Sequence, residues 1–193
     1  MLSSVEILML SAIQGISEFL PVSSAAHLFL ISHYSVFNIQ NLLIDICLHL
    51  GSLLAIIAYF IKDLLNLVQN KDFLIKILIA TIPLIPVGYL FYYSGLINSL
   101  RNIEVIAWIS LVFGILLYFS DKMKINNDLN SGFSFKSAII IGLFQVVSLI
   151  PGVSRSGITI TAARLMGFNR FDSTKISFLL AIPALSAASI LGI

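Results

Sequence analysis

Three long apolar stretches constrain this chain more than any other feature of its sequence. They cover residues 42–61, 73–93 and 103–120, and each is 18 to 21 residues long with few charged side chains. A helix needs about 20 apolar residues to cross the hydrocarbon core of a bilayer, where lipid cannot satisfy the backbone groups of an irregular segment. The stretches therefore predict spanning helices and an all-α, polytopic membrane protein.

Composition and charge narrow the functional classes. Hydrophobic residues make up 59% of the 193 residues and charged residues only 10%, against about a quarter charged in soluble domains. The net charge of +2 is scattered over short loops, which argues against a nucleic-acid partner. The single cysteine rules out an intramolecular disulfide, and no P-loop or zinc-protease motif is present. We expect one integral membrane domain over residues 1–193.

The connecting segments predict a topology. Segments 62–76 and 121–136 carry three lysines each, whereas segment 94–102 has only Arg101. The positive-inside rule places the two lysine-bearing segments in the cytoplasm and segment 94–102 outside.

Two interrupted segments suggest a shared site. Residues 1–20 and 25–32 are separated by Pro21 and two serines, and the second piece is too short to span, so a helix–break–helix that re-enters the membrane is expected. The order Gln14, apolar run, Pro21, serine pair returns as Gln145, apolar run, Pro151, serine pair. Half-repeats of approximately 1–93 and 103–193 would let two broken helices meet at one site.

Each break carries a charge that needs a partner at membrane depth. Arg155 lies between two serines in "PGVSRSG", where a guanidinium, hydroxyls and the N–H groups of a helix predicted over 158–166 can bind an anion; the alternative is a lone arginine that snorkels to the headgroups. Glu18 needs a cation, a metal or Arg155, unless it is neutral and hydrogen-bonded to a neighbouring helix.

The residues around Glu18 could add chemistry. Gln14 lies one helical turn before it, and Ser23, Ser24 and His27 follow the break. A hydroxyl near an imidazole can provide a nucleophile and a base, and a carboxylate with phosphate oxygens can hold Mg²⁺ or Ca²⁺. The serines could equally be helix caps and the histidine a structural donor.

Other polar residues are secondary candidates. His49 and Asp45 share one face of a spanning segment and could line the same cavity, whereas His33 is expected at the surface. Three further charges are expected to be interfacial or loop residues: Arg164, Arg170 and Lys175.

At these motifs the sequence resembles the undecaprenyl-diphosphatase family, also called bacitracin-resistance proteins. The resemblance rests on "QGISEFLPVSSAAH" at 14–27 and "PGVSRSGIT" at 151–159, and extends over "DICLHLGSLLAI", "IPLIPVGYLF" and "SFLLAIP". In the family's pattern Glu18 is the second acidic position, Gln14 fills the first without a carboxylate, and Lys175 stands where a glutamate is usual.

The resemblance implies an enzyme that removes the terminal phosphate of undecaprenyl diphosphate with a divalent cation, Mg²⁺ or Ca²⁺. The active site would face the outer side of the bacterial inner membrane. The enzyme would recycle the carrier lipid of peptidoglycan synthesis and thereby confer bacitracin resistance. The resemblance also implies spanning and re-entrant helices in inverted repeats, and contact with membrane lipids. A homodimer is a further option. Family members continue with further spanning helices beyond the point where this sequence ends.

We expect the diphosphate to bind Arg155 and the 152–157 loop, and Glu18 to hold the metal. The other predicted substrate contacts are Gln14, Ser23, Gly152, Ser154 and Ser156. The attacking group is Ser24, with Thr159 as the alternative, assisted by His27, or a water that these groups position. A polyprenyl phosphate transporter or flippase, which also uses broken helices, and a non-catalytic scaffold are the rival hypotheses.

Overall fold

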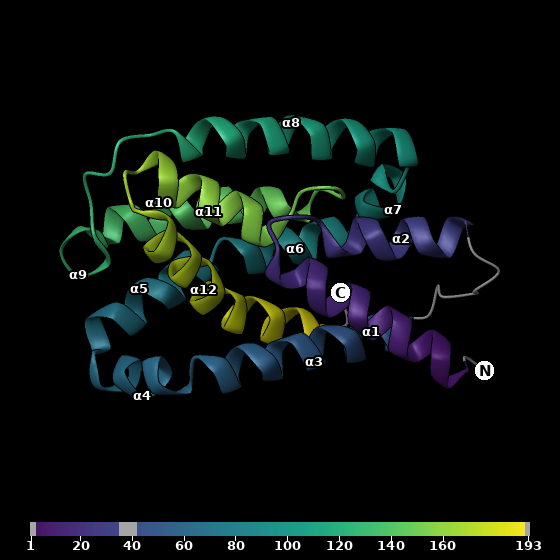
Figure 1. Ribbon diagram of the computed structural model, residues 1–193, viewed down its shortest axis with the longest axis horizontal. Helices are drawn as coiled ribbons and strands as arrows, with labels where there is room; N and C mark the ends of the chain where they lie inside the picture. Colours follow the sequence, from purple (N-terminus) through teal and green to yellow (C-terminus); the bar gives the residue numbers. More distant parts are fainter. Residues whose placement is uncertain (1–2, 35–41, 192–193) are drawn as a thin grey trace.

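The computed structural model describes residues 3–34 and 42–191, which form helices and no β-strand (Figure 1). This confirms the all-α prediction. The helices are α1 (Ser4–Phe19), α2 (Ser24–Tyr34), α3 (Leu42–Tyr59), α4 (Ile61–Gln69), α5 (Lys71–Thr81), α6 (Leu84–Tyr93), α7 (Leu96–Leu100), α8 (Ile103–Asp121), α9 (Leu129–Gly132), α10 (Phe135–Val146), the 3-10 turn η1 (Val147–Leu149), α11 (Arg155–Leu165) and α12 (Arg170–Leu191).

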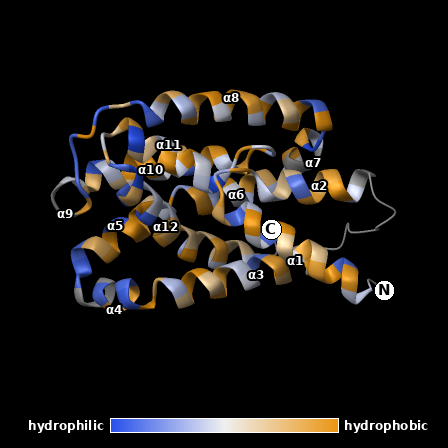
Figure 2. Ribbon diagram, in the orientation of Figure 1, coloured by the Kyte–Doolittle hydropathy of each residue, from blue (hydrophilic) through white to orange (hydrophobic). Residues whose placement is uncertain are grey.

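Among the residues that the structure describes, two helical segments are long and apolar enough to cross a membrane. One is Lys71–Tyr93, which contains α5 and α6 and a turn at Pro83, and the other is α8. Their bounds agree with the predicted stretches 73–93 and 103–120 to within two residues. The third predicted stretch, 42–61, differs, because α3 ends at Tyr59 and its apolar part, Ile46–Tyr59, is shorter than a spanning helix. The hydropathy of α8 is high along most of its length (Figure 2), and many of its exposed side chains are large and apolar: Trp108, Leu111, Val112, Ile115, Tyr118 and Phe119. Such a surface suits lipid.

Two helical hairpins point toward each other. α1 and α2 enter from one end of the molecule and turn at residues 20–23, while α10 and α11 enter from the other end and turn at residues 150–154 (Figure 1). The turns meet near the middle, where the Ser156 hydroxyl donates to the carbonyl of Leu20 at 3.1 Å. The predicted helix–break–helix is therefore present in both halves. α11 begins at Arg155, three residues earlier than the sequence suggested.

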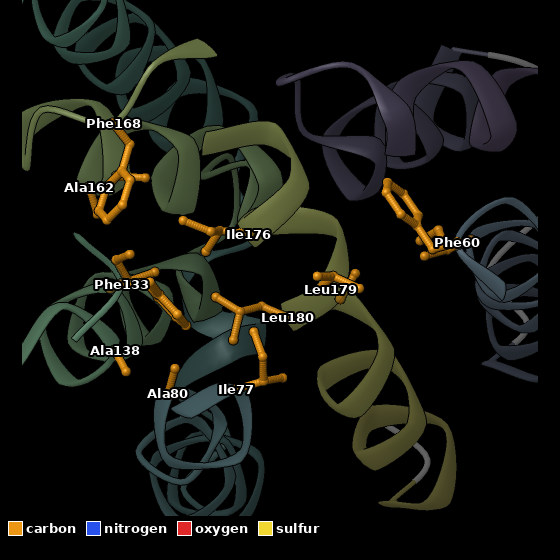
Figure 3. Close-up of a cluster of buried hydrophobic side chains, with 14 of the residues drawn as sticks. Phe60, Ile77, Ala80, Phe133, Ala138, Ala162, Phe168, Ile176, Leu179 and Leu180 are labelled. Carbon is orange, nitrogen blue, oxygen red and sulfur yellow. The ribbon is translucent and has the colours of Figure 1, made fainter. Parts of the chain in front are cut away.

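The hydrophobic core is built around α12, which packs against α3, α5 and α11. Ile176, Leu179 and Leu180 of α12 are almost fully buried among side chains of these helices and α10 (Figure 3). α10 and α5 approach closely at Gly142, since a Cβ there would lie 2.5 Å from the carbonyl oxygen of Ala80. The core thus fixes the α10–α11 hairpin against the spanning segments.

The two lysine-bearing segments lie at one end of the molecule and α7, in segment 94–102, at the other (Figure 1). Ion pairs join this first end together: Lys175 with Asp63, and Arg170 with Asp121. The arrangement agrees with the predicted alternation of the loops across the membrane.

Arg164 differs from its predicted role as an interfacial or loop charge. Its side chain is buried, with 4% of its surface exposed, and its guanidinium donates to the carbonyls of Asp121, Met123 and Phe168. It also pairs with the Asp121 carboxylate at 3.3 Å. The prediction was wrong because Arg164 donates to free carbonyls at the end of α8. These carbonyls are distant from Arg164 in the sequence, so the sequence alone does not show the contact.

Candidate active site

The two turns are shaped by short local interactions. The Ser23 hydroxyl accepts from the N–H of Ala26 at 3.3 Å, and the Ser154 hydroxyl accepts from the N–H of Gly157 at 3.1 Å as the N-cap of α11. Gly152 has φ = 98°, a conformation that side chains disfavour. These caps start α2 and α11 immediately after each break.

α8 supports the second turn from one side. The Ser110 hydroxyl donates to the carbonyl of Gly152 at 3.0 Å, and a Cβ at Gly152 would lie 2.9 Å from the carbonyl oxygen of Ile106. Glycine at this position therefore serves both the positive φ and the close approach to α8.

An ion pair connects the two turns. Arg155, the first residue of α11, donates from Nη2 to Glu18 Oε1 at 2.7 Å, and Glu18 lies in the last turn of α1. The side chains are 13% and 8% exposed. Of the alternatives for Glu18, the structure shows the one in which it meets Arg155, so each charge of the pair compensates the other.

The second carboxylate oxygen of Glu18 binds groups from the first half of the chain. The Ser24 hydroxyl donates to Oε2 at 2.8 Å, and Gln14 Nε2 donates to the same atom at 3.3 Å. Gln14, Glu18, Ser24 and Arg155 therefore form one polar cluster between α1, α2 and α11.

Some polar atoms near these turns are buried without a hydrogen-bond partner in the described part of the chain. They are Arg155 Nη1, Gln14 Oε1 and both amide atoms of Gln145. A buried polar atom without a partner is costly and rare in native proteins, so each one needs an explanation such as a bound ion or a catalytic role. The cluster can thus offer a free guanidinium donor and a free amide oxygen to a ligand.

Thr159 is placed differently from Ser24. It is fully buried, and its hydroxyl lies within hydrogen-bonding distance of the carbonyls of Arg155 and Ser156 and of Ser177 Oγ, at 2.8 to 3.1 Å. Thr159 is therefore placed to stabilise the first turn of α11. Ser177, on α12, was not predicted as a site residue, although the serine in the apolar segment "SFLLAIP" was a signal for it.

His27 is exposed, and its Nδ1 lies 2.7 Å from the carbonyl oxygen of Ser23. A carbonyl only accepts, so this contact requires the proton on Nδ1 and leaves Nε2 of the neutral ring as an acceptor. The imidazole can therefore take a proton through Nε2.

A cavity of about 210 Å³ lies where both turns meet α8. His27, Ser23 and Ser154 supply polar groups to it, whereas Glu18, Ser24 and Arg155 do not line it. The full lining is Pro21, Val22, Ser23, Ala26, His27, Ser110, Phe113, Gly114, Leu117, Gly152, Ser154, Gly157, Ile158 and Thr161. The site thus has a charged cluster and an adjoining cavity that share the same two turns.

The secondary candidates are only partly described. His49, on α3, is half-buried. The side chains of Asp45 and His33 lie outside the described residues. Within residues 3–34 and 42–191, no group of three His, Cys, Asp or Glu side chains could hold a metal ion by itself.

Comparison with known proteins gives consistent matches. The sequence model of the bacitracin resistance protein BacA family matches residues 7–193. A protein of Pelagibacter ubique named undecaprenyl-diphosphatase is 55% identical over 188 residues, covering 97% of this chain and 73% of its own length. Proteins of the same name from Roseobacter denitrificans and Saccharophagus degradans are 42% and 41% identical, covering 94% and 92% of this chain and 73% and 71% of their own lengths.

Proposed function

The chain belongs to the bacitracin resistance protein BacA family, and we propose that it hydrolyses undecaprenyl diphosphate to undecaprenyl phosphate and phosphate. This activity recycles the carrier lipid of peptidoglycan synthesis and confers bacitracin resistance. The observation that carries the proposal is the Glu18–Arg155 ion pair, which joins the two broken segments at one buried site beside the Ser24 hydroxyl.

Arg155 and the start of α11 are the groups that bind the diphosphate. Arg155 Nη1 is a buried donor without a protein partner, and a guanidinium suits phosphate oxygens. The first N–H groups of a helix have no partner within the helix and carry the positive end of its dipole. Arg155 and Ser156 are the first two residues of α11, so their N–H groups add to the anion site.

Ser24 is the first choice of attacking group. Its hydroxyl donates to Glu18 Oε2, so Glu18 is in place to accept the proton as the oxygen attacks the terminal phosphorus. The bond from that phosphorus to the bridging oxygen breaks, and undecaprenyl phosphate leaves with that oxygen. Water then hydrolyses the phosphoserine. In the alternative, water attacks directly and His27 takes its proton through Nε2.

The polar cluster also fits a divalent cation. Metal-binding oxygen atoms are available on Glu18, on Ser24 and on Gln14 as its unpartnered Oε1. Mg²⁺ and Ca²⁺ prefer oxygen ligands, and Mg²⁺ often binds through one carboxylate together with substrate phosphates and water. Glu18 would be the main protein ligand. When bound, the cation would neutralise charge on the diphosphate.

We place the protein in the bacterial inner membrane with the site open to the outer face. The lysine-bearing segments at the α4 and α9 end support a cytoplasmic position for that end (Figure 1). The α1–α2 hairpin enters from the opposite end, together with α7, so substrate would reach the turns from the outer side.

A transporter or flippase of polyprenyl phosphate is the second candidate, because two opposed hairpins with broken helices are also found in transporters. Phosphate release from undecaprenyl diphosphate in detergent, with and without EDTA, separates the two functions. Wild type should release phosphate only with the divalent cation. Well-folded wild type that releases none would eliminate the hydrolase.

The same assay tests the site. Arg155→Ala should lose activity by about 100-fold or more, in the range for loss of a charge-stabilising donor. Arg101→Ala removes the same charge from an exposed position before α8 and should keep wild-type activity. Equal rates for the two variants would contradict the role of Arg155.

A further inference from the structure

The cavity beside the polar cluster runs along two helices. α8 contributes Ser110, Phe113, Gly114 and Leu117, and the α11 side contributes Ser154, Gly157, Ile158 and Thr161. Both sets follow the spacing i, i+3, i+4, i+7, which is one face of a helix over two turns. Ser110, in the middle of α8, contacts Gly152 just before α11, and Asp121 at the end of α8 pairs with Arg164 near the end of α11. The two helices therefore run in the same direction.

The character of this face changes along α8. Ser110 contacts the second turn, where His27 and Ser154 also line the cavity. Phe113 and Leu117 lie about one and two helical turns farther, about 4.5 and 10.5 Å along the axis. A ligand with a charged head and an apolar chain therefore meets matching groups in this cavity.

Gly114 lines the cavity and is also exposed at the surface of α8. A Cβ added there would have no heavy atom within 4 Å. By contrast, a Cβ at Gly157 would lie 3.2 Å from the carbonyl oxygen of Pro21. Protein packing thus explains Gly157 but gives no reason for a glycine inside α8, where alanine would be the better helix former.

We propose that this cavity seats the isoprene units next to the diphosphate, and that Gly114 forms the opening through which the rest of the chain passes into the bilayer. The inference rests on the proposed function, since it assigns the lipid end of the same substrate. A volume of about 210 Å³ is far too small for the whole undecaprenyl chain. Only the units beside the head would lie within the protein, and Phe113 and Leu117 would contact them.

Substitutions that fill the opening test the proposal. Gly114→Ala and Gly114→Leu add increasing volume, and the Cβ that both introduce would have no heavy atom within 4 Å. Gly51→Leu is the matched control, because Gly51 is also an exposed helical glycine with no atom within 4 Å of its Cβ, and it lies away from the cavity on α3. All variants and wild type are purified in detergent, checked for folding by thermal unfolding, and assayed for kcat and KM with undecaprenyl diphosphate.

We expect KM to rise with side-chain volume, by at least tenfold for Gly114→Leu, while kcat changes less than threefold. Gly51→Leu should keep both constants within twofold. Inorganic pyrophosphate, which has no chain, should inhibit wild type and Gly114→Leu with equal inhibition constants.

Three results would overturn the inference while leaving the hydrolase intact. The first is unchanged KM in Gly114→Leu, and the second is a loss of kcat alone. The third is a pyrophosphate inhibition constant that rises in parallel with KM, because the cavity would then hold the diphosphate and not the chain. If Gly114→Leu does not fold, the same three measurements on Gly114→Ala test the inference. An inactive wild type would instead reject the proposed function.

Discussion

Glu18 and Arg155, 137 positions apart in the sequence, form an ion pair of 2.7 Å between the two turns, and both side chains are largely buried. Loss of one partner from a buried pair leaves an uncompensated charge and costs about 3–5 kcal/mol. We therefore expect Glu18→Gln and Arg155→Gln each to lower the unfolding temperature clearly, as measured by thermal unfolding in detergent.

The double variant Glu18→Gln/Arg155→Gln is the control for this prediction. It leaves no unpaired charge, so it should unfold closer to wild type than either single variant does. A double variant that is as unstable as the sum of the two single variants would show that the charges do not act as a pair.

Ser24 and Thr159 should differ in what they contribute. Ser24→Ala removes the hydroxyl bonded to Glu18 and should lower kcat by about 100-fold or more, with little change in the unfolding temperature. Thr159→Val removes a buried hydroxyl that contacts Ser177 and should cost about 1–3 kcal/mol of stability, while most activity remains. Phosphate release and thermal unfolding measure both effects.

Acid-quenched reactions with labelled substrate complete this test. Label that stays on wild-type protein but not on Ser24→Ala supports attack by the serine oxygen. If Thr159→Val is inactive at normal stability and Ser24→Ala is active, the assignment of the two hydroxyls is reversed.

Gln14 should limit the affinity for the divalent cation. Its Oε1 is buried without a partner beside Glu18, and a carboxylate is a stronger ligand than an amide oxygen. Gln14→Glu should therefore lower the Mg²⁺ concentration needed for half-maximal phosphate release. Glu18→Gln should raise that concentration or abolish activity. Equal magnesium dependence in wild type and both variants would show that the cation binds elsewhere.

Gly142 should be intolerant of any side chain. A Cβ there would lie 2.5 Å from the carbonyl oxygen of Ala80, a backbone atom that cannot rotate away. Gly142→Ala should lower the unfolding free energy by about 1–3 kcal/mol or more through overpacking. Gly88→Ala is the control, since its Cβ would make an ordinary contact of 3.6 Å with Leu149. Equal thermal unfolding of these variants would contradict the close approach of α10 and α5.

Much of the fold could be predicted from local sequence patterns. The length of the apolar stretches located Lys71–Tyr93 and α8 to within two residues, and Pro21 with its serines located the break between α1 and α2. The start of α11 was placed three residues late, although Ser154 and Gly157 have the spacing of an N-cap bond. The apolar residues after Arg155 predicted the start of α11 less well than this N-cap spacing does.

The site was predictable in its members but not in their orientations. Two charges that both need a partner in an apolar chain made Arg155 one of the partners expected for Glu18, and the structure shows that pair. The Ser24 hydroxyl, on α2, faces the Glu18 carboxylate, whereas the Thr159 hydroxyl, on α11, contacts Ser177 on α12. Sequence spacing orders residues around one helix but carries no information on the rotation of one helix against another.

The opposed hairpins have a consequence for biosynthesis. At about 5–20 residues per second, Arg155 follows Glu18 out of the ribosome by roughly 7–27 seconds for their separation of 137 residues. During that interval the N-terminal hairpin carries the Glu18 carboxylate without the Arg155 guanidinium that pairs with it in the folded protein. The charge of Glu18 is therefore compensated by Arg155 only after the second half of the chain has been made.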